Sequence, residues 1–481
     1  MSRSSLLRAA AVAAPVAIFL AVYSVFPPDV PLITPDSDSY LNFTGIRSGG
    51  YPFFLAILKP LAHAPSNYAV AQLVFYAFAV LILAWQLLAS FRSLLFCLLT
   101  ELLLLGNWEV NRYHFVILTE SVLLSTSALF LAAALAHLRT GSLLALAAAS
   151  ACAAYAMAIR PTGIAFIAAL LLILLMSPGF SRRMPMHLFA AAAPLIIVLG
   201  GEALYYRALH SGPRTSLLAI QMLGKAGMVA VADPQQLIDS EPASSKPLQT
   251  ALEVGLEPVR DLVANAPSIA ARCRLAVNYE TFVEYAFALP ERRELVATAG
   301  EGALTKAALV RLRHGVPDYI RLTGDYFFCL WTFWAAENRE KAALAAYIDA
   351  RKPLPFQHEV LPFLATSASP PFISVLRAGM LGVAGLFALA GACLLVALGR
   401  RRSPGVAPAV AGLCGMIVHG GLLLSALGGV GIARYAHGLW VPLAVGLVAS
   451  IAWMERWLRS FTSPPRPSSP ANAGDPVHTG H

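Results

Sequence analysis

The sequence has little charge for its length. Only 13% of its 481 residues are Asp, Glu, Lys or Arg, while 58% are hydrophobic and the mean hydropathy is +0.66. A soluble domain of this length does not need so apolar a composition to fill its core. Apolar runs of membrane-spanning length recur along the chain, and they predict an all-α polytopic membrane protein.

Four further features of the sequence narrow the class of protein. The net charge of +9 comes from basic residues in small groups between apolar runs, which argues against nucleic acid as a partner. The cysteines have no metal-type spacing, although Cys273 and Cys329 lie in a long polar segment and could pair. No small-residue cleavage site precedes Pro27, which favours an uncleaved first anchor. No internal repeat is found, which weighs against transporters built from duplicated halves.

The apolar runs predict a bundle of about ten transmembrane helices. We expect them near residues 8–27, 67–89, 92–106, 115–137, 141–158, 161–177, 187–207, 373–399, 405–427 and 434–458. Arginines fall in every second connection between these spans. The positive-inside rule therefore places both termini in the cytoplasm and the remaining loops, including 28–66 and 208–372, outside it.

This topology divides the chain into four parts. They are an N-terminal transmembrane module (1–207), a large extracytoplasmic segment (208–372), C-terminal transmembrane helices (373–459) and a disordered cytoplasmic tail (460–481) rich in Pro and Ser. Within the extracytoplasmic segment, the aromatic stretch 319–336 predicts a helix at the membrane interface, with an eleventh span as the alternative.

The first outer loop places two acids, Asp36 and Asp38, and an arginine, Arg47, beside the membrane. Charge held there is costly and usually functional. A carboxylate could take a proton from an attacking hydroxyl, and an arginine could bind a phosphate in bidentate fashion. The alternative is that Asp36 only caps a helix begun around Asp38. The apolar stretch 53–58 is too short to span and predicts a helix along the outer interface.

Other polar residues are expected at the same membrane face. Glu120, about one turn into the fourth span, could hydrogen-bond substrate, pair with Arg112 or orient the first-loop acids. Arg160 and Arg434 face outward against the positive-inside rule, which suggests an anionic partner such as a lipid-linked phosphate. Snorkelling to phospholipid headgroups is the alternative for both arginines.

These residues resemble a known family. Asp36-Ser-x-x-Tyr40-Leu41, followed by Arg47-x-x-Gly-Tyr-Pro52 and a short apolar helix, is similar to the first outer loop of the GT-C glycosyltransferases. The likeness is greatest to bacterial members related to protein mannosyltransferases and lipid A aminoarabinose transferases. Leu118-Thr-Glu-Ser121, Arg160-Pro161 and Arg434-Tyr435 are similar to further landmarks of that group. Gly49 departs from the pattern, because relatives commonly have proline there.

The resemblance implies a GT-C-like bundle in the bacterial plasma (inner) membrane. It implies transfer of a sugar, with inversion, from a polyprenyl-phosphate donor to an acceptor glycan, lipid or protein on the extracytoplasmic face. Asp36 would be the catalytic base, Asp38 a neighbour that replaces or assists it, and Glu120 would position acceptor or base. The substrate-binding candidates are Tyr40, Arg47, Tyr51, His114, Arg160, Arg434 and Tyr435.

The sequence leaves open whether a cofactor is bound, and it allows two alternative functions. A divalent metal between the two first-loop acids is the one cofactor left open, because two aspartates make only a partial site. One alternative function is a transporter or flippase for a lipid-linked saccharide, which predicts charges at mid-membrane. Another is a non-catalytic subunit of cell-envelope polymer assembly. The sugar and the acceptor do not follow from the sequence.

Overall fold

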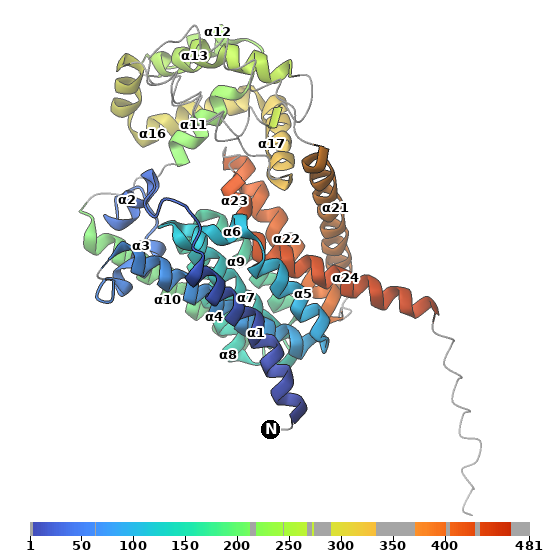
Figure 1. Ribbon diagram of the computed structural model, residues 1–481. Helices are drawn as coiled ribbons and strands as arrows, with labels where there is room; N and C mark the ends of the chain where they lie inside the picture. The colour runs from blue at the N-terminus through green and yellow to red at the C-terminus, as the bar shows by residue number, and fades with distance from the viewer. Residues whose placement is uncertain are drawn as a thin grey trace, which may run out of the picture.

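The computed structural model describes residues 3–62, 64–211, 218–243, 245–266, 272–273, 290–332, 371–400, 405–428 and 433–462. The regular structure in these ranges is entirely helical. Figure 1 shows a bundle of long helices with a smaller group, α11 to α17, at one end of it. The predicted all-α architecture is confirmed.

Seven helices are long and apolar enough to cross a membrane. They are α1 (Arg3–Val25), α4 (Pro65–Phe91), α7 (Thr119–Thr140), α10 (Met184–Leu209), α21 (Pro371–Gly399), α22 (Val406–Gly428) and α24 (Trp440–Thr462). At about 1.5 Å per residue, roughly 20 helical residues cover a hydrocarbon core of about 30 Å. The seven helices indicate an integral membrane protein.

Three of the ten expected spans are shorter or bent. α8 (Leu143–Ile159) has 17 residues and α9 (Ile164–Met176) has 13. α5 (Leu94–Leu105) is followed by α6 (Trp108–Asn111) and the 3-10 helix η1 (Arg112–Phe115), with a bend of 57° between the two parts. Counting the bent pair as one span gives at most eight long spans in the described ranges, so ten full-length spans are not found.

Helix α7 lies at the centre of the bundle, packed against α4 and α8. In the most apolar 18-residue stretch of α7, 78% of the residues are buried. Three of its hydroxyls are satisfied within the helix, since Ser125, Thr126 and Ser127 donate to carbonyls one turn back at 3.0, 2.7 and 2.7 Å. Because the helix is surrounded, Glu120 in its first turn is fully buried.

Two short helices form the first outer loop, α2 (Pro35–Leu41) and α3 (Gly50–Leu58). The predicted short apolar helix is thus present, but it begins at Gly50 rather than at Phe53. α3 touches the end of α8, where a Cβ on Gly50 would lie 2.7 Å from the carbonyl of Ala158. The Tyr155 hydroxyl also donates to the carbonyl of Gly50 at 3.0 Å. Glycine is required here because a side chain would separate the two helices.

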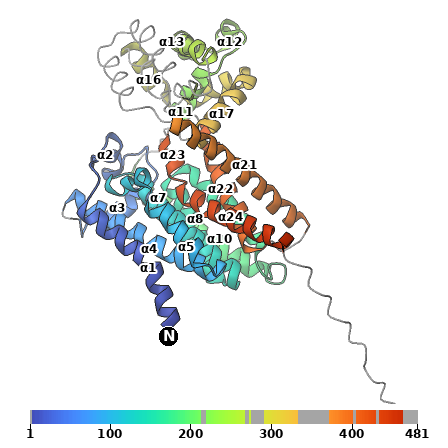
Figure 2. The same cartoon turned by 45° about the vertical axis from the view of Figure 1, so that its right-hand side comes forward.

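Figures 1 and 2 show α2, α3, α6 and α23 (Ala433–His437) at the same end of the bundle as the α11–α17 group. We call this the outer end and the group the outer group. The amino terminus lies at the opposite end. α7 has Glu120 in its first turn at the outer end and runs for 22 residues, so its last turn, with Arg139, lies at the other end. The sidedness of the loops and termini expected from the arginines stays a prediction.

The outer group is held together by a disulfide and by buried charge. Its helices are α11 (Leu218–Met228), α12 (Pro234–Ser240), α13 (Lys246–Ala264), α16 (Pro290–His314) and α17 (Val316–Trp331). Cys273 forms a disulfide with Cys329 of α17, which settles the pairing that the sequence left open. Glu253 accepts from both Arg260 and Arg311 at 2.5 Å. Both arginines also donate to carbonyls at the end of α11, at 2.6 and 2.9 Å.

The aromatic helix α17 packs along α22. Trp331 is buried, and its indole N–H donates to His419 Nδ1 at 3.3 Å. With 16 residues, α17 is not among the long apolar helices, so the alternative of an eleventh span gains no support. Residues 333–336 of the predicted aromatic stretch, most of the tail 460–481 and much of the segment 208–372 lie outside the described residues.

Lys225 of α11 connects the outer group to the bundle. Its ammonium group donates to Thr323 Oγ1 at 2.7 Å and to the carbonyl of Ala426, near the end of α22. It also faces the rings of Tyr319 and Tyr326, at 4.7 and 5.2 Å from their centroids. The side chain is fully buried, and burial lowers the pKa of Lys225 to about 7.

Candidate functional site

The start of α2 shows that Asp36 is not a helix cap. Thr34 precedes the helix, and its backbone N–H donates to Ser37 Oγ at 2.9 Å. The Ser37 hydroxyl in turn donates to the carbonyl of Ile117 at 2.9 Å, which ties α2 to the segment before α7. Thr34 and Ser37 therefore form the cap, and the alternative in which Asp36 only caps the helix is wrong.

Asp36 instead forms an ion pair with Arg47. Arg47 Nη2 donates to Asp36 Oδ1 at 2.7 Å, and the side chains are 13% and 29% exposed. Arg47 Nε donates to Ser39 Oγ at 2.7 Å, and Nη1 donates to Tyr40 Oη at 3.2 Å. The guanidinium carbon lies 4.4 Å from the Tyr40 ring centroid. The acid thus remains within reach of water, while the arginine is fixed on several sides.

Glu120 and Arg160 form the second ion pair. Arg160 Nη2 donates to Glu120 Oε1 at 2.8 Å, and Thr119 Oγ1 donates to Glu120 Oε2 at 3.3 Å. The guanidinium of Arg160 lies over the ring of Tyr435 in α23, at 4.4 Å from the centroid. Arg160 follows the last residue of α8 in extended backbone, and this directs its side chain across the start of α7.

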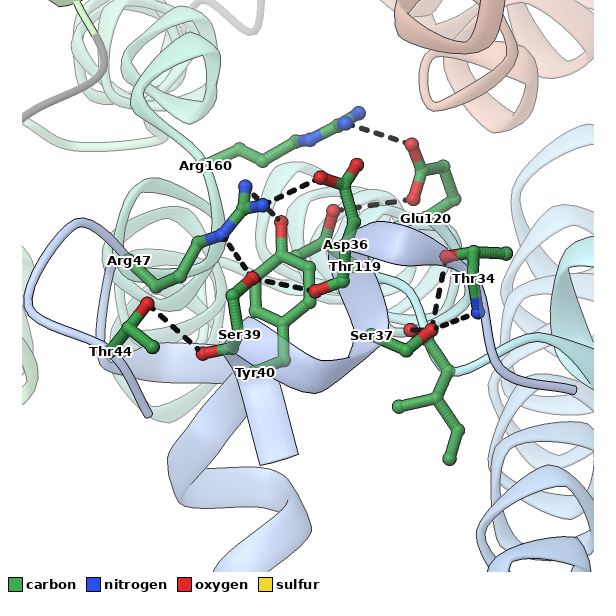
Figure 3. A network of polar contacts seen from close by, with 11 residues as sticks. Thr34, Asp36, Ser37, Ser39, Tyr40, Thr44, Arg47, Thr119, Glu120 and Arg160 are labelled. Carbon is green, nitrogen blue, oxygen red and sulfur yellow. Dashed lines mark hydrogen bonds and ion pairs between the residues drawn. The ribbon is translucent and has the colours of Figure 1, made fainter. Parts of the chain in front are cut away.

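The two ion pairs lie next to each other at the outer end. Figure 3 shows the carboxylate of Asp36 between the guanidinium of Arg47 and the Glu120–Arg160 pair. Two acids and two arginines therefore meet at one place, although they come from separate segments of the chain. A guanidinium binds phosphate in bidentate fashion, and a partly exposed carboxylate accepts a proton, so this group fits phosphate binding and proton transfer.

Asp38 does not join this group. It is exposed, and its Oδ1 accepts a hydrogen bond from the Asn42 amide at 2.9 Å, one turn along α2. The two first-loop acids therefore differ in surroundings, and Asp36 is the one beside the arginines. In the part of the chain that the structure describes, no group of three or more His, Cys, Asp or Glu side chains is arranged to hold a metal ion.

Tyr51 and His114 are both buried, and Tyr51 packs against Tyr40 beside the first ion pair, with ring centroids 5.2 Å apart. The Tyr51 hydroxyl donates to Gln72 Oε1 at 2.8 Å, and the Gln72 amide donates to the carbonyl of His114 at 3.0 Å. Burial raises the pKa of Tyr51 well above its usual range, and Tyr40 and Glu120 add to the rise. The His114 ring stacks on Tyr76 with centroids 4.2 Å apart. These contacts give both residues a packing role.

The surroundings of Arg112 and Arg434 bear on two further expectations. Arg112 pairs with Glu109 at 3.2 Å on the surface, and Glu120 pairs with Arg160 rather than with Arg112, which was one of its three possible roles. The reason is that Arg160 reaches Glu120 from the end of a neighbouring helix in the bundle. Arg434 belongs to α23, next to Tyr435, but its side chain lies outside the described part of the structure.

Two residues of α10, and His210 directly after it, contact the first loop, although none of them was predicted as a site residue. Glu202 Oε1 accepts from the backbone N–H of Gly49 at 2.7 Å, and the Tyr206 hydroxyl donates to the carbonyl of Gly45 at 2.9 Å. His210 Nε2 lies 2.7 Å from the carbonyl of Phe43. The available signal was the spacing of four residues, which places Glu202 and Tyr206 on one face of α10, whereas His210 lies just past the end of the helix.

Comparisons with protein-family models, with curated proteins and with solved structures found no match to this chain.

Proposed function

We propose that this protein is a membrane glycosyltransferase that moves a sugar from a polyprenyl-phosphate donor to an acceptor on the extracytoplasmic face, with inversion at the anomeric carbon. The observation that supports this most is the meeting of the Asp36–Arg47 and Glu120–Arg160 pairs at one end of an apolar bundle. A lipid-linked phosphate is an anion that arrives through the membrane, and two fixed arginines at the membrane edge suit it.

The proposed orientation places the outer end outside the cytoplasm. The amino terminus and the last turn of α7, with Arg139, lie opposite to it, as the positive-inside rule requires. The Cys273–Cys329 disulfide in the outer group also supports this side, because disulfides persist in oxidising compartments. We retain ten spans in the proposal, with α8, α9 and the bent α5–η1 segment as short crossings, since only then do the arginines alternate.

Asp36 is the proposed base. It takes the proton of the acceptor hydroxyl as the acceptor oxygen bonds to the anomeric carbon from the side opposite the phosphate. The carbon–oxygen bond to phosphate breaks, and the polyprenyl phosphate leaves with the bonding electrons. Attack from the opposite side inverts the anomeric centre. The partial exposure of Asp36, 29%, supports access by an acceptor, whereas the full burial of Glu120 supports a role in holding Arg160.

The arginines would hold the donor phosphate and stabilise the charge that develops as it leaves. Arg47 is already bound to Asp36, so a donor phosphate and Asp36 compete for the same guanidinium. Donor binding would therefore draw Arg47 away and free the carboxylate for the acceptor proton. Arg160 keeps its orientation through Glu120 and Tyr435, which makes it the more rigid of the two.

A transporter or flippase for a lipid-linked saccharide is the second candidate, and Glu101 is the observation that favours it. This carboxyl lies within α5, is fully buried and has one oxygen without a hydrogen-bond partner among the described residues. Ionisable groups inside spans often mark transport pathways. Glu101→Gln separates the two functions, because it should leave sugar transfer intact and would stop transport through a pathway that uses this acid.

The direct test is a transfer assay with the purified chain in lipid bilayers. Polyprenyl-phosphate sugars of several kinds are supplied with a mixture of cell-envelope acceptors, and release of polyprenyl phosphate is measured. Release that depends on acceptor, and that falls in Arg160→Ala, supports the proposal. Movement of intact donor across the bilayer without release would replace the enzyme with a transporter.

A further inference from the structure

The last turns of α10 and the residue that follows it contact the first outer loop. Glu202 and Tyr206 are four residues apart and lie on one face of α10, and His210 follows the end of the helix in extended backbone. Their side chains contact the backbone of Gly49, Gly45 and Phe43 at 2.7, 2.9 and 2.7 Å.

These contacts bracket Arg47. Gly45 precedes it by two residues and Gly49 follows it by two, so the backbone is held on both sides of the arginine. The loop is also clamped at Phe43, whose backbone has a positive φ of 41°, uncommon for a residue with a side chain. The Phe43 ring stacks on Tyr205 at 5.2 Å, and the His210 ring meets its edge at 4.7 Å.

We propose that Glu202, Tyr206 and His210 are positioning residues that set the place of Arg47 at the site. This inference rests on the proposed function, in which Arg47 binds the donor phosphate. Their hydrogen bonds end on backbone groups of the loop, so they act through Arg47. Loss of any one of them gives the loop more conformations and reduces the fraction of molecules in which the guanidinium is in place.

The variants Tyr206→Phe and His210→Ala test the proposal, with Leu204→Ala as the matched control. Leu204 lies on the same helix and is 68% exposed, away from the loop contacts. Two quantities are measured in lipid nanodiscs: hydrogen exchange of residues 43–49, and binding of polyprenyl phosphate without sugar. We expect exchange to accelerate and affinity to fall by about fivefold for each hydrogen bond lost, with the control unchanged.

A kinetic readout separates positioning from general damage. Tyr206→Phe should raise the donor KM about fivefold and leave kcat at saturating donor near the wild-type value, since bound phosphate restores the position of Arg47.

Three outcomes would contradict the proposal. Unchanged hydrogen exchange in both variants would show that these side chains do not hold the loop. Faster exchange with unchanged polyprenyl-phosphate affinity would overturn their role in positioning Arg47. A wild-type chain that binds no polyprenyl phosphate would overturn the proposed function and this role together, while the exchange data would still show whether α10 holds the loop.

Discussion

Glu120 and Arg160 lie 40 residues apart in the sequence and form an ion pair of 2.8 Å between the start of α7 and the end of α8. The pair is buried, and the ring of Tyr435 in α23 packs against the guanidinium of Arg160. Three segments thus meet at one guanidinium. Because both charges are removed from water, each depends on the other for compensation.

Breaking this pair should be costly. Glu120→Ala leaves Arg160 buried without its counter-ion, so we expect the free energy of unfolding to fall by about 3–5 kcal/mol. Glu109→Ala breaks the exposed pair with Arg112 and should cost about 0–1 kcal/mol. Thermal unfolding in detergent measures both. Equal losses in the two variants would show that the buried pair does not stabilise the fold.

The competition between Asp36 and phosphate for Arg47 predicts an unusual result. Asp36→Asn removes the carboxylate charge but keeps the side-chain size, so polyprenyl phosphate should bind up to about tenfold more tightly, a change of 1.4 kcal/mol. Asp38→Asn serves as the control, because Asp38 is exposed and its carboxylate accepts from Asn42 rather than from an arginine. Binding is measured without sugar, so it does not depend on catalysis. Weaker binding in Asp36→Asn would contradict competition for Arg47.

Lys225 should make stability depend on pH. Burial lowers its pKa to about 7 in the folded chain, from an ordinary value of 10.5. Between these values the unfolded chain holds the proton and the folded chain does not, so the free energy of unfolding should rise with pH from about 7 to 10.5. Below about pH 7 the full cost of burying the charge is present. Lys225→Met should flatten this rise, while Lys306→Met on the exposed face of α16 should preserve it. Chemical denaturation at pH 7 and 9 measures the change in the free energy of unfolding. An equal change in Lys225→Met and in the wild-type protein would show that Lys225 is not responsible.

The disulfide tests the orientation of the chain. If the outer group lies outside the cytoplasm, Cys273 and Cys329 should be oxidised in intact membranes and resist a thiol reagent until reduced. Replacing both by Ser should lower the free energy of unfolding by about 2–4 kcal/mol. Free thiols at both positions in freshly isolated membranes would place the outer group in a reducing compartment and reverse the topology.

Much of the fold follows from the sequence, because apolar runs must form helices wherever the backbone meets lipid. The common sidedness of Asp36, Glu120 and Arg160 follows in the same way from the arginines of the opposite loops. The ends of the short spans also agree with the sequence. The expected spans 161–177 and 92–106 end within one residue of α9, at Met176, and of α5, at Leu105.

The partners of the site residues could not be predicted, because they are set by packing between helices. Glu120 had Arg112 nearby in sequence, yet α8 brings Arg160 closer in space. Tyr51 and His114 belong to residue types that bind substrates, but in this apolar bundle the Tyr51 hydroxyl bonds to Gln72 and His114 Nδ1 bonds to Ser121. The spacing of Glu202 and Tyr206 on α10 was visible in the sequence. The loop that they contact is known only from the structure.

The most direct test of the proposed function is sugar transfer by Asp36→Asn, measured beside Asp38→Asn in the same bilayers. Loss of a general base typically costs about 10²–10⁴ in rate, so we expect Asp36→Asn to lose transfer by that factor. Asp38→Asn should retain it, and both should unfold at the wild-type temperature. Full transfer by a folded Asp36→Asn protein would contradict the assignment of this acid as the base.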